Sequence, residues 1–226
     1  MHNGFRGRLR AKRRQPMPFL RNHIYPLLVD ILGNPQPIRK IRQQLIPLAQ
    51  GTVLEIGIGS GENFIHYDPA KVRKLYALEP NPGMIRLAEK QLHRTRLNVE
   101  FLELPGEHIP LQDGTIDTVV STFTLCTIPG IAEAIQGIGR VLRPDGQLIF
   151  FELGLSPDPT VQHWQKRLEP LHHWLFQGLY LTRDIATLIT RGGFQIEHME
   201  TACLAQFPKS SSHCYWGTAI MPSRES

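Results

Sequence analysis

The sequence predicts an α/β fold in which a mostly parallel sheet of seven strands carries helices on both faces and ends in an antiparallel strand pair. After Gly51, short apolar segments alternate with segments in which apolar residues recur at helical spacing. This alternation is typical of a parallel sheet that is covered on both faces. Near the end of the chain, the apolar segments 194–199 and 213–221 are joined by a loop alone, and strands connected in this way pair antiparallel.

The expected elements are bounded by residues that favour turns or end helices. An Asp113-Gly114 turn precedes one strand, Pro144 ends a helix, and Gly192-Gly193 forms a turn before the last strand pair. The other strands are expected at 52–56, 74–78, 99–102, 116–121 and 147–152, and the helices at 82–93, 130–142 and 182–191.

The chain divides into segments of different composition. Residues 1–16 are expected to be a disordered basic tail. Residues 17–50 are expected to form two helices that cap a binding cleft, because apolar residues recur at helical spacing on both sides of a Gly33-Asn34-Pro35 break. Residues 51–226 form the main domain, in which the segment 156–180, rich in proline, tryptophan and histidine, is expected to be an insert.

The excess of positive charge belongs to the N-terminal tail. The chain has 25 Lys and Arg residues against 20 Asp and Glu, a formal net charge of +5. Seven of the basic residues, and none of the acidic ones, lie within residues 1–21, so the rest of the chain is slightly acidic. Such an arm can contact an anionic membrane or a nucleic acid through charge alone. A solvated terminus without a partner is an equally good interpretation.

Membrane-spanning and secreted classes do not fit this sequence. No apolar run approaches the ~20 residues that cross a bilayer, and the N-terminus lacks the apolar core of a secretory signal. The three cysteines form no CxxC pair, which suits a reducing compartment. We expect a cytoplasmic protein with no transmembrane segment. No metal site is expected, because the histidines lack supporting ligands at metal-binding spacing.

A glycine-rich loop is the strongest candidate for a binding site. Gly57, Gly59 and Gly61 follow a predicted strand and precede a predicted helix, and glycines there let the backbone approach a ligand closely. The next predicted strand ends at Glu79, 18 residues after Gly61. An acidic residue in this place can bind the hydroxyl groups of a ribose.

The spacing of the glycines excludes the commoner nucleotides. A dinucleotide loop needs a small residue at the position of Glu62, and a phosphate-binding P-loop needs a GK[ST] sequence that is absent here. The ligand is therefore expected to contain ribose without pyrophosphate. Glu55, just before the first glycine, suits a cationic amino-acid group better than a phosphate.

Together these residues resemble class I methyltransferases. Residues 55–61 resemble their motif I and Glu79 their acidic motif II, while 106–117 and 140–147 resemble segments of the UbiE-like, type 11 subgroup. The resemblance implies a Rossmann-like fold and S-adenosylmethionine as cofactor. Pro105 stands where the subgroup often has Asp, so backbone groups near Glu107 and His108 are expected to contact the adenine. The implied cofactor-binding residues are Glu55, Gly57, Gly59, Gly61, Asn63, Glu79, Pro80, Gly106, Glu107, His108, Thr122 and Phe123.

The second half resembles a narrower group. Residues 174–184, with 121–129, are similar to thiol methyltransferases of vertebrate microsomes and their bacterial relatives, which commonly have Gly-Cys in place of Gly178-Leu179. The acceptor implied is small and apolar: a thiol, a quinol or a lipid-like molecule. His172, His173 and Tyr180, with His163 as a further candidate, could act as base or orienting group. Trp164, Trp174 and Phe176 would shape an apolar pocket or pack in the core.

Two other functions compete with this interpretation. An RNA methyltransferase would use the arginine-rich tail, but the rest of the chain is not basic and no amine-methylating motif follows the fourth strand. A non-catalytic binding module could keep the same fold, since a fold does not determine a function. The intact glycine loop and Glu79 favour retained cofactor binding.

Overall fold

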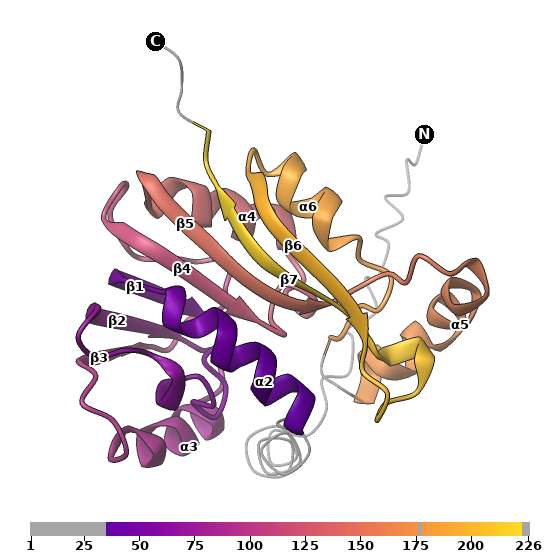
Figure 1. Ribbon diagram of the computed structural model, residues 1–226, viewed down its shortest axis with the longest axis horizontal. Helices are drawn as coiled ribbons and strands as arrows, with labels where there is room; N and C mark the ends of the chain where they lie inside the picture. Colours follow the sequence, from indigo (N-terminus) through magenta and orange to yellow (C-terminus); the bar gives the residue numbers. More distant parts are fainter. Residues whose placement is uncertain (1–34, 176–177, 223–226) are drawn as a thin grey trace, which may run out of the picture.

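The computed structural model describes residues 35–175 and 178–222. They are built around one sheet of seven strands in the order β3-β2-β1-β4-β5-β7-β6 (Figure 1). The strands are β1 (Gly51–Ile56), β2 (Val72–Leu78), β3 (Val99–Leu102), β4 (Ile116–Thr122), β5 (Leu142–Leu153), β6 (Gln195–Cys203) and β7 (His213–Ile220). The predicted fold class is confirmed.

The direction of the strands places the candidate site. Strands β1 to β5 are parallel, and β7 pairs antiparallel with both β5 and β6. Strand β1 pairs with β2 on one side and with β4 on the other, so the strand order reverses between β1 and β4. Open α/β sheets bind ligands beyond the carboxyl ends of their strands at this kind of switch point.

Helices cover both faces of the sheet. Helices α2 (Gln36–Leu45) and α3 (Pro82–Leu92) contribute to one buried apolar cluster, and α4 (Ile131–Val141) and α6 (Ile185–Arg191) to the other. Helix α5 (Pro159–Leu175) follows β5 and extends away from the sheet (Figure 1). None of the helices that the structure describes is long and apolar enough to cross a membrane.

Helix α2 is the second of the two helices predicted within residues 17–50. It begins after Pro35 and has a proline in its first turn, where the missing N–H would have no partner in any case. A 3-10 turn, Ile46–Leu48, follows it and leads into β1. The first predicted helix and the tail at residues 1–16 lie outside the described part of the chain.

The prediction of a helix directly after the glycine loop is wrong. Only a 3-10 turn, Phe64–His66, follows the loop, and Tyr67 then adopts an extended backbone with φ −68° and ψ 142°. Pro69 contributes to the difference, because a proline disfavours a helical conformation at the residue before it, here Asp68, and so leaves no room for a longer helix after the loop. The short turn brings Asn63 and Tyr67 close to the end of β1.

Two further boundaries differ from the prediction. Strand β5 begins at Leu142, which pairs with Ile116 of β4; the ladder is then irregular until Gln147 pairs with Thr118. The insert at 156–180 contains the seventeen-residue helix α5, which has Pro170 in its interior. A proline in a helix interior removes one backbone hydrogen bond and usually ends or kinks the helix. The prolines of this segment therefore do not favour the prediction of a long helix.

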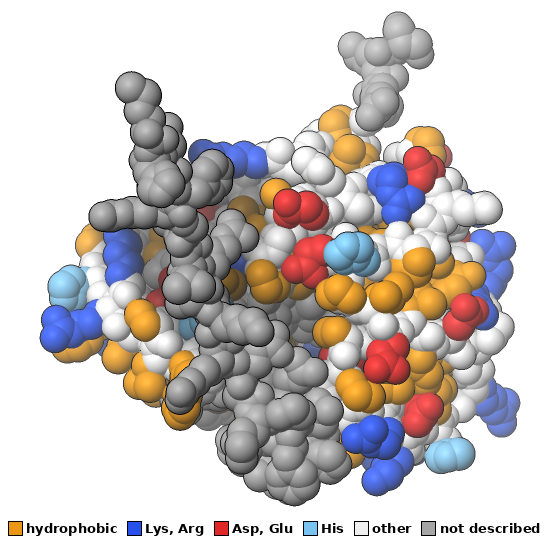
Figure 2. All heavy atoms as spheres, turned by 180° about the vertical axis from the view of Figure 1, so that it is seen from behind, with side chains coloured by type: hydrophobic (Ala, Val, Ile, Leu, Met, Phe, Trp, Pro, Cys, Tyr) orange, Lys and Arg blue, Asp and Glu red, His pale blue; other side chains and the backbone are white. Residues whose placement is uncertain are grey.

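The surface carries mixed charge. Figure 2, the side opposite to Figure 1, shows Lys and Arg side chains scattered among Asp, Glu and groups of hydrophobic residues. Several charges pair locally, such as Arg73 with Asp117 at 3.0 Å and Lys74 with Glu100 at 2.7 Å. The described residues of this face form no continuous basic stripe of the kind that binds nucleic acid.

Candidate active site

The loop after β1 is kept open by its glycines. Gly57, Gly59 and Gly61 have φ angles of +70°, +55° and +84°, in the left-handed region that glycine adopts without strain. A β-carbon on Gly57 would lie 2.2 Å from Oγ1 of Thr124, so a larger residue would push away the loop after β4. A β-carbon on Gly59 would meet nothing within 4 Å. The backbone at Gly59 therefore faces open space in which a ligand can lie.

Glu79 connects this loop to the neighbouring strand. It directly follows β2, and its two carboxylate oxygens accept hydrogen bonds from the backbone N–H groups of Gly59 (3.2 Å) and Asn81 (2.9 Å). Burial raises the pKa of Glu79 to about 7, although both hydrogen bonds lower it. Lone pairs remain on both oxygens for further donors, such as two adjacent ribose hydroxyls. Pro80, the next residue, is exposed.

Glu55 lies at the centre of a buried polar cluster. Asn63 Nδ2 donates to one of its oxygens at 2.6 Å and the Tyr67 hydroxyl to the other at 2.7 Å. The same amide group also donates to Thr122 Oγ1 at the end of β4 (3.1 Å). Burial raises the pKa of Glu55 to about 7, and the two side-chain hydrogen bonds lower it. The cluster thus ties the segment that follows the glycine loop to the ends of β1 and β4.

A single buried carboxylate anchors the loop after β4. Glu152, near the end of β5, accepts hydrogen bonds from the Ser121 hydroxyl (2.7 Å) and from the backbone N–H groups of Thr124 (3.1 Å), Leu125 (3.0 Å) and Cys126 (3.2 Å). Burial raises the pKa of Glu152. Glu152 is not among the residues that the sequence predicts for the site. An acidic residue within an apolar strand is the signal that could have found it.

The same loop is strained and is held from a second side. Phe123 has a φ of 53°, a conformation that a residue with a β-carbon keeps only where its surroundings fix it. Arg183 donates hydrogen bonds to the carbonyl oxygens of Leu125 and Ile128, the latter at 2.6 Å. The amides and the carbonyls of this loop are therefore both bound to buried or half-buried charged side chains.

The catalytic candidates are brought together only in part. The ring centroids of His173 and Tyr180 lie 4.7 Å apart, and the Tyr180 backbone N–H donates to the carbonyl oxygen of Cys126, in the loop after β4 (2.8 Å). Nδ1 of His173 is buried without a hydrogen-bond partner among the described residues. Nδ1 of His172 instead lies 3.0 Å from the Leu168 carbonyl of its own helix. A catalytic role for these three residues stays a prediction.

The aromatic residues of the insert differ from the expectation. The side chains of Trp164 and Trp174 are 51% and 70% exposed, so they do not pack in the core. His163, next to Trp164 on α5, is also exposed. Phe176 lies outside the described residues. Packing of the two tryptophans in the core is therefore contradicted, and an apolar pocket shaped by Trp164, Trp174 and Phe176 stays a prediction.

The segment predicted to contact adenine is tied to helix α4. Glu107 accepts a hydrogen bond from the backbone N–H of Gly130 at 3.0 Å, at the start of that helix. Gly106 is buried, and a β-carbon there would lie 2.5 Å from Cδ1 of Ile128 and 3.1 Å from Cγ2 of Ile56. This contact places Gly106 beside the end of β1. Adenine contact by the backbone near Glu107 and His108 stays a prediction.

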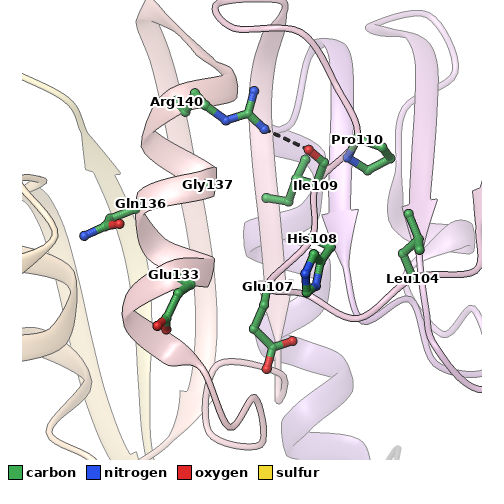
Figure 3. A pocket seen from close by; sticks show the side chains of 9 residues that line it. All are labelled: Leu104, Glu107, His108, Ile109, Pro110, Glu133, Gln136, Gly137 and Arg140. Carbon is green, nitrogen blue, oxygen red and sulfur yellow. Dashed lines mark hydrogen bonds between the residues drawn. The ribbon is translucent and has the colours of Figure 1, made fainter.

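A surface pocket of about 530 Å³ lies between this segment and α4 (Figure 3). It is lined by Leu104, Glu107, His108, Ile109, Pro110, Glu133, Gln136, Gly137 and Arg140. Arg140 reaches across one end and donates to the Ile109 carbonyl oxygen at 2.8 Å. No residue of the glycine loop lines the pocket, and neither does Glu79. The pocket is therefore separate from the loop that we assign to the cofactor.

The groups around the glycine loop fit S-adenosylmethionine. Gly59 leaves room for the ligand, Glu79 has lone pairs for ribose hydroxyls, and Asn63 Oδ1 is a buried acceptor without a partner among the described residues. An acceptor of this kind suits the ammonium group of the methionine part. The fold and this site define a class I S-adenosylmethionine-dependent methyltransferase.

Comparison with known proteins gives the family. Residues 54–150 match a methyltransferase domain family, type 11. The human thiol S-methyltransferase TMT1B is 33% identical over 175 residues, which cover 71% of this chain and 70% of that protein. The human thiol S-methyltransferase TMT1A is 32% identical over 161 residues, 68% of this chain and 65% of its own length. The chain belongs to the type 11 group of class I S-adenosylmethionine-dependent methyltransferases.

Proteins of lower similarity are named for other reactions. The ubiquinone/menaquinone biosynthesis C-methyltransferase UbiE of Bartonella tribocorum is 27% identical over 172 residues, 74% of this chain and 62% of that protein. Among solved structures, the [4+2]-cyclase SpnF has a TM-score of 0.65 at 14% identity, with 82% of this chain and 80% of that chain covered. Because SpnF is named as a cyclase, the shared fold alone does not specify the reaction.

Proposed function

We propose that this protein transfers a methyl group from S-adenosylmethionine to a small apolar thiol. The observation that carries the proposal is the 33% identity to a thiol S-methyltransferase over 175 residues, a stretch longer than the domain match at 54–150. The similarity therefore includes residues outside the cofactor-binding part, where the acceptor would bind. A quinol or a lipid-like molecule is the alternative acceptor, and the similarity to UbiE supports the quinol.

The cofactor supplies a methyl group that its sulfonium already activates. The protein then has to hold the acceptor in line with that group and exclude water, and orientation of this kind can lower a barrier by ~7–11 kcal/mol. The loop after β4 suits this task, because Glu152 and Arg183 fix its backbone from two sides. The fixed loop gives the acceptor a rigid wall.

His173 is the candidate for taking the proton of the thiol. Its imidazole is half-buried, Nδ1 has no hydrogen-bond partner among the described residues, and its ring lies against Tyr180. Imidazole groups titrate near neutral pH and can accept a proton from a thiol. Tyr180 would keep the imidazole in place, because its own ring is held by Arg183, whose guanidinium carbon lies 4.1 Å from the phenol ring centroid.

A turnover assay tests the proposal. Formation of S-adenosylhomocysteine should be measured with the full chain and a panel of alkyl thiols, aryl thiols, quinols and phospholipids. We expect turnover with thiols and little with the other classes. Turnover with quinols alone would replace the thiol by the alternative acceptor. Cofactor binding without turnover on any of them would support a binding module.

Removal of residues 1–16 separates the small-molecule function from an RNA methyltransferase. We expect thiol methylation and cofactor binding to stay unchanged without this basic segment. Loss of methylation together with loss of RNA binding would instead assign the reaction to RNA.

A further inference from the structure

Helix α2 carries a buried arginine next to the glycine loop. Arg42 is only 6% exposed, although arginine rarely lies inside a protein unless it is paired. Its guanidinium carbon is 6.0 Å from the ring centroid of Phe123, in the loop after β4. Its charge also acts on Glu55 and Glu62, at the start and the end of the glycine loop. Arg42 therefore lies between the two loops that form the site.

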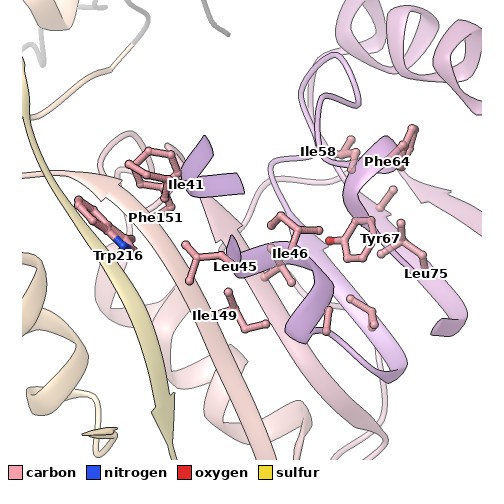
Figure 4. Packing of buried hydrophobic residues seen from close by; sticks show 14 of the residues in the cluster. Ile41, Leu45, Ile46, Ile58, Phe64, Tyr67, Leu75, Ile149, Phe151 and Trp216 are labelled. Atoms are coloured by element: carbon pink, nitrogen blue, oxygen red, sulfur yellow. The ribbon is translucent and has the colours of Figure 1, made fainter. Parts of the chain in front are cut away.

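The packing of α2 holds this arginine in place. Ile38, Ile41 and Leu45 from the same helix are buried in the cluster that includes Phe151 and Trp216. Figure 4 shows Ile41 and Leu45 of α2 above the strands that carry Phe151 and Trp216. A side chain on a helix fixed in this way has its position set before any ligand binds.

Within the part of the chain that the structure describes, the guanidinium has no matching anion at ion-pair distance. Nε of Arg42 is buried and has no hydrogen-bond partner there, and Arg42 is not a member of the ion pairs found in this part. A buried charge without a partner is destabilising, and burial lowers the pKa of Arg42. An anionic ligand group at this position would stabilise the guanidinium.

Asn63, which lies in the same buried cluster, has an acceptor oxygen without a donor among the described residues. Asn63 is 1% exposed, and its Oδ1 accepts no hydrogen bond in the described part of the chain. Its Nδ2 is already used by Glu55 and Thr122. The cluster thus offers an unpaired cationic donor, an unpaired acceptor and, at Glu55, a nearby carboxyl group.

This combination matches a zwitterion. A carboxylate can bind the guanidinium of Arg42 through its planar array of N–H donors, while an ammonium group can donate to Asn63 Oδ1 and is attracted by Glu55. A phosphate fits less well, because Glu55 and Glu62 would repel its larger negative charge. An α-amino acid group carries both required charges on one carbon atom.

We propose that Arg42 binds the α-carboxylate in the methionine part of S-adenosylmethionine, so that helix α2 is part of the cofactor site. The sequence predicts residues 17–50 as a cap over the cleft; this inference gives one of its residues a defined ligand group. It rests on the cofactor assignment and is independent of which acceptor is methylated.

Two ligands and one substitution test the inference. S-adenosylhomocysteine contains the amino-acid group, whereas 5′-methylthioadenosine lacks it and keeps the adenosine. Arg42→Met retains most of the apolar stem and removes the charge. By calorimetry we expect it to weaken S-adenosylhomocysteine binding roughly tenfold to hundredfold, as for the loss of a charged hydrogen bond, and to leave methylthioadenosine binding unchanged. The matched control is Arg39→Met, at an exposed position of α2, which should change neither affinity.

The outcomes separate the possible failures. Equal affinity of wild type and Arg42→Met for S-adenosylhomocysteine, or an equal loss for both ligands, would overturn the inference in favour of a structural role. Failure of the wild-type protein to bind S-adenosylhomocysteine would instead overturn the cofactor assignment. If Arg42→Met does not fold, Arg42→Lys keeps the charge without the planar donors. We expect this variant to lose affinity for S-adenosylhomocysteine alone, and unchanged affinity would contradict the inference.

Discussion

The glycine loop and the insert at residues 156–180 both follow carboxyl ends of parallel strands, yet they are built differently. Around the glycine loop, Glu55 and Glu79 are buried and each accepts two hydrogen bonds. In the insert, Trp164 and Trp174 are largely exposed and His173 is half-buried. The region that we assign to the cofactor is therefore fixed before binding, whereas the region that we propose for the acceptor presents side chains near solvent. Fixed hydrogen-bonding groups indicate which ligand they fit, so the cofactor can be inferred from the structure more readily than the acceptor.

The loop after β4 joins the two regions, and its anchor gives the largest expected effect. Glu152→Ala would leave four donors, three of them buried, without their acceptor, so we expect the free energy of unfolding to fall by about 3–5 kcal/mol. Urea denaturation measures this loss. Glu197→Ala, an exposed position in β6 of the same sheet, is the control and should change stability little. A Glu152→Ala protein as stable as the control would show that the loop is not anchored in this way.

Glu79→Ala tests the fixed side of the comparison. It removes the carboxylate that we assign to the ribose hydroxyls and that accepts from Gly59. We expect affinity for S-adenosylhomocysteine to fall roughly a hundredfold, from the loss of two charged hydrogen bonds. Calorimetry measures this change against Glu89→Ala, an exposed glutamate on α3. Equal affinities of the two variants would remove Glu79 from the site.

His173→Ala tests the acceptor side. If the imidazole removes a proton from the thiol, we expect kcat/KM with an alkyl thiol to fall roughly tenfold to hundredfold. An aryl thiol that is already ionised at the assay pH needs no base and should lose little. His163→Ala, at an exposed position of the same helix, is the control. Equal losses with both thiols would indicate that His173 acts only in packing.

The smallest expected effect is on the pH dependence of the free energy of unfolding. Burial raises the pKa of Glu79 from an ordinary value of 4.5 to about 7, so between these values the folded state binds more protons than the unfolded state. The free energy of unfolding contributed by this group therefore falls as pH rises from about 4.5 to about 7. Glu79→Gln does not titrate, so its stability should depend less on pH in this window. Urea denaturation at pH 5 and pH 7.5 measures the difference. Identical pH dependence of the two proteins would contradict burial of an ionisable group here.

The comparison also explains what the sequence could predict. The seven strands with their antiparallel last pair, the spacing of Gly57, Gly59 and Gly61, and the place of Glu79 after β2 follow from local patterns and general rules of parallel sheets. Residues whose partners are distant in the sequence could not be identified from local patterns. Arg42 reaches the site only because α2 packs over the sheet, and Glu152 meets the loop after β4 only because β4 and β5 are neighbours.

Some predictions failed for identifiable physical reasons. Pro69 limits the segment after the glycine loop to a 3-10 turn. The tryptophans of the insert resemble core residues in sequence, but helix α5 carries them outward.

Calorimetric titration of the wild-type protein with S-adenosylhomocysteine tests the central claim most directly. The measurement is best made near pH 8, where the carboxyl groups of Glu55 and Glu79 are ionised. We predict saturable binding at one site per chain, with methylthioadenosine competing for the same site. A titration with no heat of binding, and no competition in a parallel equilibrium dialysis, would contradict the assignment of the glycine loop to this cofactor.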